Sequence, residues 1–163
     1  MTNTLLIQSQ YELDKALADG VADLRIEHPL GIYLTIADDP GFWLILRGNS
    51  HAVLGGDVSA TLLENARAML RENASAELWG NSHAELLENA SATLRGNSHA
   101  ALWGNSHAAL RENASAELSR FTVAWLRSPL AKATGTGHVI DMTAVDLGDP
   151  ALWADFHGVK VVE

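Results

Sequence analysis

Leucine recurs at every eighth position through the middle of the chain, from Leu54 to Leu118. Cut after these leucines, residues 47–118 divide into nine octads. In every octad the eighth residue is Leu and the sixth is Ala, and the third is Asn except at Asp57. The octads read RGNSHAVL, GGDVSATL, LENARAML, RENASAEL, WGNSHAEL, LENASATL, RGNSHAAL, WGNSHAAL and RENASAEL. Near-copies at a fixed period are typical of repeat architectures, in which each unit packs on its neighbours.

The octad period fits a strand better than a helix. Ala, Leu, Glu and Arg favour helices, but at about 100° per residue successive leucines would shift by about 80° and share no face. Octad positions 4, 6 and 8 are mostly Ser or Ala, Ala and Leu, and they alternate with mainly polar positions 5 and 7, which is the period of a strand. Gly or Glu followed by Asn, at positions 2 and 3, is typical of a tight turn. Each octad therefore predicts one short strand and one corner.

One octad cannot close a turn, so several must form each coil of a solenoid. The first octad position reads best in groups of three: Arg, Gly, Leu; Arg, Trp, Leu; Arg, Trp, Arg. Glu at the second position of every third octad agrees with that frame, at Glu64, Glu88 and Glu112. We therefore predict an all-β fold, a parallel β-helix (β-solenoid) with about 24 residues and three faces per coil, and five coils over residues 23–142. The alternative is a flatter solenoid with two octads per coil.

The two ends of the chain have the patterns of caps on a single domain. Residues 8–20 carry Leu13, Ala16 and Leu17 at helical spacing, so residues 1–22 predict an N-terminal cap with a helix. Residues 149–158 predict a short helix and residues 159–163 a last strand, within a C-terminal cap over 143–163. Such caps protect the open edges of a solenoid from stacking with another chain.

Composition narrows the function classes. The 163 residues hold 20 acidic and 11 basic side chains, a net charge of −9, which argues against nucleic acid as a partner. The absence of Cys excludes disulfides and thiolate zinc sites. The chain has no apolar run near the ~18 residues of a membrane span and no signal-like start. We therefore expect no membrane association and a cytoplasmic location, or the virion if a phage encodes the protein.

Outward octad positions are where a binding site would lie. The three-octad frame stacks the tryptophans and histidines of equivalent octads on one face and three arginines on another. The candidate partner- or ligand-binding residues are therefore Trp79, Trp103, His83, His107, Arg47, Arg71 and Arg95. The tryptophans suit a protein partner, self-association, sugar stacking or mere corner packing. The Asn of each octad is interpreted as a structural ladder.

The same rows offer little for chemistry. The Ser-His pair is copied with the octad, so we expect no catalytic residues and interpret the histidines as solvated strand residues. His83 and His107, if adjacent, have the spacing of a weak zinc or nickel site, and the row of glutamates that of a calcium site. Neither set has converging ligands with a second shell, so we expect no metal and no cofactor.

The octad pattern [RWL]-[GE]-N-[SA]-[HS]-A-x-L resembles the octapeptide-repeat β-solenoid proteins of actinobacteria and their phages. The stretch from Asp23 to Leu34 after the predicted helix is similar to the start of such proteins, and residues 137–142 and 153–161 are similar to the cap that follows their repeats. The likeness covers residues 8–163. It implies a fold, because its motifs are structural and bring no catalytic residues.

Three functions are consistent with these patterns. The first is a non-enzymatic structural or interaction scaffold, phage- or prophage-encoded, that binds a protein partner or itself through its surface ladders. The second is a polysaccharide-binding or polysaccharide-processing β-helix. The third is an acidic DNA mimic that inhibits a DNA-binding protein, which the concentration of acidic charge in residues 1–46 disfavours.

Overall fold

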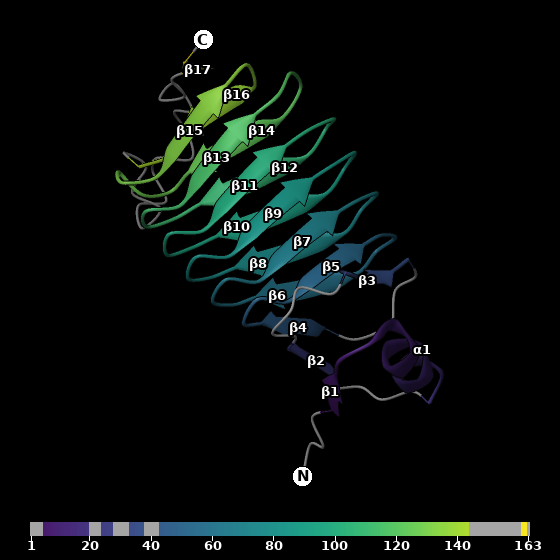
Figure 1. Cartoon of the computed structure of the whole chain (residues 1–163). Coiled ribbons are helices and arrows are strands. Elements are labelled where there is room, and N and C mark those ends of the chain that lie inside the picture. The colour runs from purple at the N-terminus through teal and green to yellow at the C-terminus, as the bar shows by residue number, and fades with distance from the viewer. Residues whose placement is uncertain (1–4, 20–23, 28–32, 38–42, 144–160, 163) are drawn as a thin grey trace, which may run out of the picture.

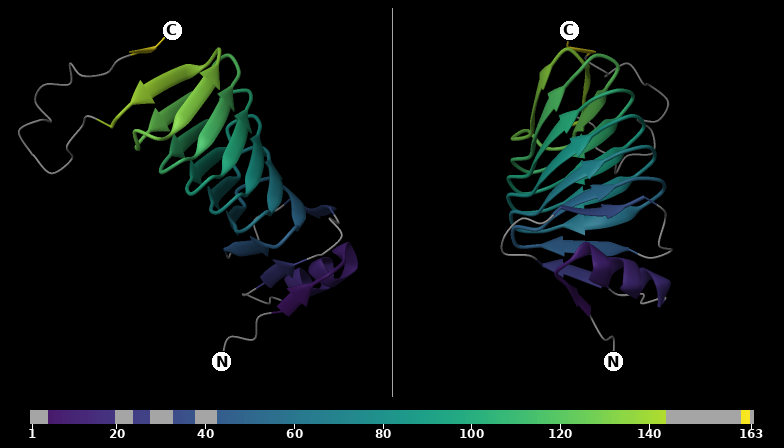
Figure 2. Two further views of the ribbon diagram at one scale, coloured as in Figure 1. Left: turned by 60° about the vertical axis from the view of Figure 1, so that its left-hand side comes forward. Right: turned by 45° about the vertical axis from the view of Figure 1, so that its right-hand side comes forward.

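Parallel strands stacked coil upon coil form nearly the whole molecule, which was obtained as a computed structural model (Figures 1 and 2). The structure describes residues 5–19, 24–27, 33–37, 43–143 and 161–162. Within them the chain makes a β-solenoid of about six turns, with one helix at its N-terminal end. The predicted fold class, an all-β parallel β-helix, is confirmed.

The strands form two sheets that face each other. Sheet A has ten strands and sheet B has seven, and all neighbours are parallel except β16 and β17. Sheet A consists of β1 (Leu5–Ile7), β2 (Leu24–Glu27), β4 (Leu44–Arg47), β6 (Ser59–Leu62), β8 (Ser75–Leu78), β10 (Ser91–Leu94), β12 (His107–Leu110), β14 (Val123–Leu126), β16 (His138–Asp141) and β17 (Val161–Val162). Sheet B consists of β3 (Tyr33–Ile36), β5 (His51–Leu54), β7 (Arg67–Leu70), β9 (His83–Leu86), β11 (His99–Leu102), β13 (Ser115–Leu118) and β15 (Lys132–Gly135).

Each coil contains two octads, one in each sheet. Leu54 of β5 pairs with Leu70 of β7, sixteen residues on, and Leu78 of β8 pairs with Leu94 of β10. The prediction of 24 residues per coil is therefore wrong, and the alternative of two octads per coil is confirmed. The reason lies in the corner, where position 2 of the octad adopts a left-handed conformation that reverses the chain, so two corners close a coil.

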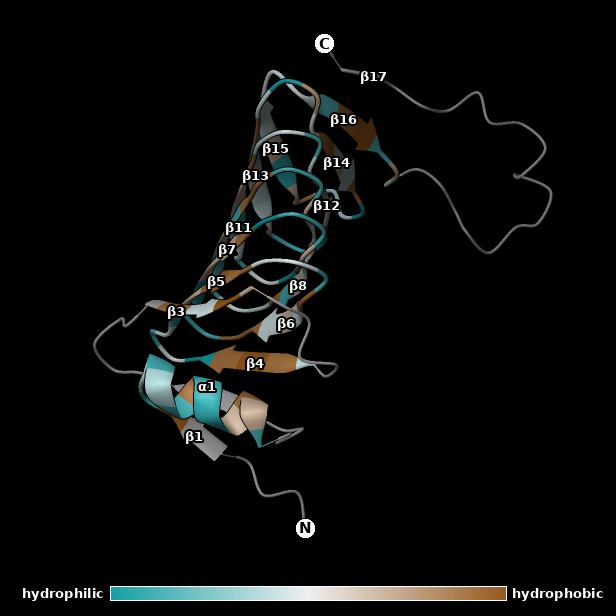
Figure 3. Ribbon diagram, turned by 90° about the vertical axis from the view of Figure 1, so that its right-hand side faces the viewer, coloured by the Kyte–Doolittle hydropathy of each residue, from teal (hydrophilic) through white to brown (hydrophobic). Residues whose placement is uncertain are grey.

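The core is a narrow stack of small and branched apolar side chains. All nine octad leucines are buried, from 0% exposure at Leu54 to 4% at Leu118, and the octad alanines lie beside them. The corners between the sheets are hydrophilic (Figure 3). At roughly 1.5–3 kcal/mol for each buried Leu, this ladder supplies much of the driving force for folding. The predicted inward direction of the leucines is confirmed.

The corner residues alternate between Gly and Glu at one strained position. Position 2 has a positive φ whether it is Gly, as at Gly104 (70°), or Glu, as at Glu88 (58°). Each Glu offsets the strain with a hydrogen bond: the Glu88 carboxylate accepts from the backbone N–H of Glu72, one coil earlier, at 3.0 Å. The same bond joins Glu64 to Gly48, Glu72 to Gly56 and Glu112 to Gly96. The glutamates are therefore structural, and they lie at both corners instead of the single corner predicted.

The asparagine ladder is confirmed at the pairs whose side chains bond. Asn113 donates to the side chain of Asn97 at 3.3 Å, and Asn73 donates to Asp57 at 3.1 Å. Both pairs join successive coils at a corner. These two pairs therefore stabilise the stack.

The helix predicted in the N-terminal cap is confirmed. Helix α1 spans Gln10–Ala18, with Ser9 as its N-cap, and buries Leu13 and Ala16. The Gln10 side chain bonds both backbone groups of Thr35, which ties α1 to β3. The last predicted strand is present as β17, whereas the helix predicted over 149–158 lies outside the described residues.

Candidate functional site

The two-octad coil separates the residues that the sequence analysis placed together. Trp79 follows sheet A and Trp103 follows sheet B, so they lie at opposite corners. His83 belongs to β9 of sheet B and His107 to β12 of sheet A. The predicted Trp–Trp and His–His rows are therefore wrong, because both depended on a 24-residue repeat.

The arginines are also redistributed. Arg47 ends β4 and Arg95 follows β10, two strands of sheet A that lie three coils apart, whereas Arg71 lies at the corner after sheet B and contacts Met69. The predicted row of these three is wrong. A different row replaces it: Arg95, Arg111 and Arg127 follow β10, β12 and β14, which are adjacent in sheet A. We call these three residues the arginine row.

Backbone hydrogen bonds hold the arginine row in register. The N–H of Arg111 donates to the carbonyl of Leu94 at 2.9 Å, and the N–H of Arg127 donates to that of Leu110 at 2.8 Å. The Arg95 guanidinium lies 4.7 Å from the ring centroid of Trp79, a cation–π contact with the previous coil. Trp79 therefore packs against a neighbouring arginine instead of another tryptophan.

The histidines of sheet B form their own row. His83 and His99 stack with ring centroids 5.0 Å apart, and Nδ1 of His99 lies 2.9 Å from the hydroxyl of Ser115. Burial, and then the positive charges of His99 and Arg67, lower the pKa of His83 below its ordinary value of 6.5. In the described part of the chain no three His, Asp or Glu side chains gather into a metal site.

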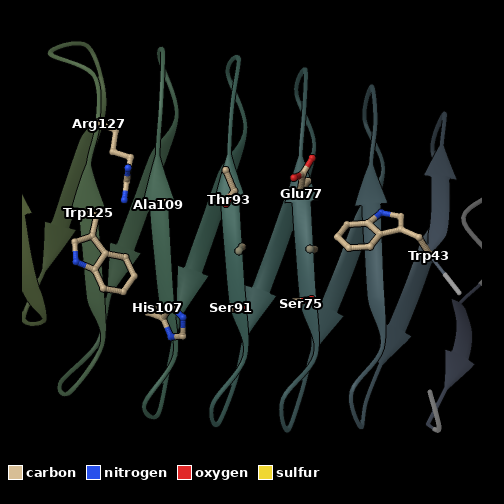
Figure 4. A pocket seen from close by; sticks show the side chains of 11 residues that line it. Trp43, Ser75, Glu77, Ser91, Thr93, His107, Ala109, Trp125 and Arg127 are labelled. Atoms are coloured by element: carbon tan, nitrogen blue, oxygen red, sulfur yellow. The ribbon is translucent and has the colours of Figure 1, made fainter. Parts of the chain in front are cut away.

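The outer face of sheet A holds a shallow groove of about 320 Å³ (Figure 4). Trp43 and Trp125 stand at its two ends, and small side chains of β8, β10 and β12 form the floor between them (Figure 4). The floor and edges are lined by Ser75, Ala76, Glu77, Ser91, Ala92, Thr93, His107, Ala109 and Arg127. No loop interrupts these strands, because each corner has the same short octad length.

Contacts along the sheet position both tryptophans. The indole N–H of Trp43 donates to the hydroxyl of Thr61 on β6 at 2.6 Å, while the side chain remains 49% exposed. Trp125 is half-buried and meets His107 of β12 edge-to-face, with centroids 5.3 Å apart. From β6 to β12 is three strand spacings, or ~14 Å, which is the open floor between the two rings.

Neither tryptophan was among the sequence-predicted candidates. Trp125 occupies position 7 of the diverged octad 119–126, and its alignment with Ala109 places it on the outer face. Trp43 lies just before β4, where the octad copies are no longer clean. The available signal was an aromatic residue at an outward position of an octad that has drifted from the consensus.

A second hollow, of about 330 Å³, lies on sheet B beside Trp103. Its lining includes Glu117, Ser119, Thr134 and Thr136. Trp103 is 54% exposed there. This hollow has one aromatic side chain instead of two and no cation, so the groove on sheet A is the better-equipped binding surface.

Comparison of the chain with protein-family models, with curated proteins and with solved structures finds no match. The resemblance to octapeptide-repeat proteins, and the phage origin it implies, therefore stay predictions. None of the helical segments that the structure describes has the length and apolar character to cross a membrane.

Proposed function

We propose that the protein is a non-enzymatic binding scaffold whose ligand is an extended polysaccharide lying in the groove of sheet A. The observation that carries the proposal is the pair of tryptophans, Trp43 and Trp125, at the two ends of one flat floor. This combines two functions expected from the sequence, the scaffold and the polysaccharide binder, on a single face.

The floor suits sugars because most of its outward side chains are small or carry hydroxyl groups. Ser91 and Thr93 present hydroxyl groups that donate and accept hydrogen bonds, and Ala109 leaves room for a ring to approach. The hydroxyl of Ser75 bonds that of Ser59 at 3.0 Å. An indole ring has a flat apolar face that packs against the C–H faces of a sugar while its edge stays solvated. The strands repeat at a constant spacing, and such a surface matches the repeating units of a polymer better than it matches a compact ligand.

The histidines on both sheets make contacts with neighbouring coils. His83 packs on His99, His99 faces Ser115, and His107 packs on Trp125. Each of these contacts orders a surface ladder. The scaffold hypothesis also has a competing form. In it, a protein partner or a second copy of the chain binds the exposed Trp103 at the corner after sheet B.

A glycan array followed by titration calorimetry tests the proposal. We expect binding to one class of extended glycan, and loss of most of that binding in Trp43→Ala and Trp125→Ala. Trp103→Ala is the matched control, because this exposed tryptophan lies at the opposite corner, and it should bind as the unchanged protein does. Absence of glycan binding, or equal losses in all three variants, would overturn the proposal.

A further inference from the structure

The arginine row carries three like charges on adjacent coils without a carboxylate partner. None of Arg95, Arg111 and Arg127 forms an ion pair with any residue that the structure describes. The Nε atoms of Arg95 and Arg111 are buried and lack a hydrogen-bond partner there. Successive members are one strand spacing apart, ~4.8 Å. An unneutralised cationic row on a protein of net charge −9 forms a local patch that attracts anions.

The row runs along the edge of the sheet A groove. Arg127 lines the groove beside Trp125, and its side chain extends over the floor from the end of β14 (Figure 4). Arg111 and Arg95 occupy the same octad position one and two coils earlier. A polymer lying between the tryptophans would therefore meet Arg127 and pass the strand ends that Arg111 and Arg95 follow.

We propose that the ligand of the groove is an acidic polysaccharide, whose carboxylates bind the arginine row while its sugar rings pack on Trp125 and Trp43. This inference rests on the proposed function and names its substrate class. Guanidinium groups bind carboxylates through paired N–H donors, so Arg at this edge would orient a carboxylate as well as attract it. Stacking on Trp79 holds the Arg95 guanidinium in a fixed plane.

Two acidic side chains near the row, Glu112 and Glu77, do not neutralise it. Glu112 follows Arg111 directly, but its carboxylate accepts the backbone N–H of Gly96 at 2.7 Å. Glu77 lies on the floor in β8, three strands from β14 and closer to the Trp43 end. Its charge repels a carboxylate at that end. The two ends of the groove therefore differ in charge. Anionic sugars would lie near Arg127, and uncharged sugars would lie near Trp43.

Charge density favours an acidic glycan over a nucleic acid. Each strand of a DNA duplex carries a phosphate every ~3.4 Å of the helix axis, and the whole of that polymer must approach a protein of net charge −9. An acidic glycan separates its carboxylates by uncharged hydroxyl-bearing groups, which match the Ser and Thr side chains of the floor.

Titration calorimetry with a matched pair of polymers tests this inference. The probes are polygalacturonate and the same polymer with its carboxyls methyl-esterified. We expect polygalacturonate to bind about 10-fold or more tightly than the ester, a preference that weakens between 0.15 and about 1 M salt because exposed charges are screened. The double variant Arg111→Gln, Arg127→Gln should lose that preference. Arg71→Gln, at the opposite corner, should keep it, and Glu77→Gln should strengthen binding several-fold.

The outcomes separate the two proposals. Equal binding of the acid and the ester, unchanged by the arginine variants, would overturn the acidic ligand and leave the polysaccharide scaffold standing. Binding of neither polymer, with no other glycan bound on the array, would overturn both. Tighter binding of single-stranded oligouridylate than of polygalacturonate would also overturn the inference in favour of nucleic acid. Circular dichroism spectra identical to that of the unchanged protein are required of each variant.

Discussion

Position 2 of the octad is either Gly or Glu, and we predict that a Gly at this position is replaced by Glu at a lower cost in stability than by Ala. Gly104 has a φ of 70°, and a Cβ added there would lie 2.9 Å from the backbone nitrogen of Glu88. Gly104→Ala therefore introduces left-handed strain of about 1–2 kcal/mol together with a close contact. Gly104→Glu introduces the same strain and contact, but it also supplies a carboxylate.

That carboxylate could accept a hydrogen bond from the backbone N–H of Glu88. The backbone N–H of Glu88 has no acceptor among the described residues, whereas the equivalent N–H of Glu72 donates to the Glu88 side chain at 3.0 Å. Glu at position 104 would extend this ladder by one coil. An exposed hydrogen bond of this kind recovers about 0.5–1.5 kcal/mol. We expect Gly104→Glu to be about 1 kcal/mol more stable than Gly104→Ala, and both less stable than the unchanged protein.

Thermal and urea unfolding, followed by circular dichroism, measure the difference. For a chain of this length 1 kcal/mol shifts Tm by roughly 2–4 °C. Gly55→Ala is the control, because Gly55 lacks a positive φ and its added Cβ would meet nothing closer than 3.6 Å, so its stability should change by less than about 0.5 kcal/mol. Equal stabilities for Gly104→Ala and Gly104→Glu would refute the role assigned to the corner glutamates.

Three further results follow from the structure. Leu86→Lys should unfold the protein, because it places a charge in a fully buried stack. Glu85→Lys, on the exposed side of the same strand, should fold. An unchanged melting temperature for Leu86→Lys would disprove the inward direction of the leucines. The folded pKa of His83 is below its ordinary 6.5, so the unfolded chain binds the extra proton, and the His83 contribution to stability should be fully present above pH 6.5 and decline as pH falls below it. His83→Gln should flatten that part of the pH–stability curve, and an unaltered curve would contradict the assignment. A far-ultraviolet circular dichroism spectrum should be dominated by strand, with a small contribution from α1, and a mainly helical spectrum would exclude the solenoid.

Each octad's own residues were sufficient to predict its local structure. Alternation of inward Ala and Leu with outward side chains requires a strand, and Gly or Glu before Asn requires a corner, whatever lies in the next coil. The helix at residues 10–18 was equally readable, because Leu13, Ala16 and Leu17 share one face above the N-cap Ser9. These features depend on neighbours in sequence, so they can be predicted from the pattern.

The number of octads per coil depends on contacts between residues distant in sequence, and the pattern at positions 1 and 2 was a poor guide to it. Those positions lie at the outer corners, where Arg, Trp, Leu and Glu can exchange without changing the core. Glu72, which falls outside the every-third series, was the available sign that the series was not structural.

By itself, then, the sequence determined the strand, the corner and the inward leucines, because each follows from the conformational preferences of eight consecutive residues. The tertiary structure alone decided that two corners close a coil. That choice depends on the total reversal at the left-handed positions and on how the leucines of two facing sheets pack together. It determines which side chains become neighbours sixteen residues apart, and so it separated Trp79 from Trp103 and brought Arg95, Arg111 and Arg127 together beside the groove.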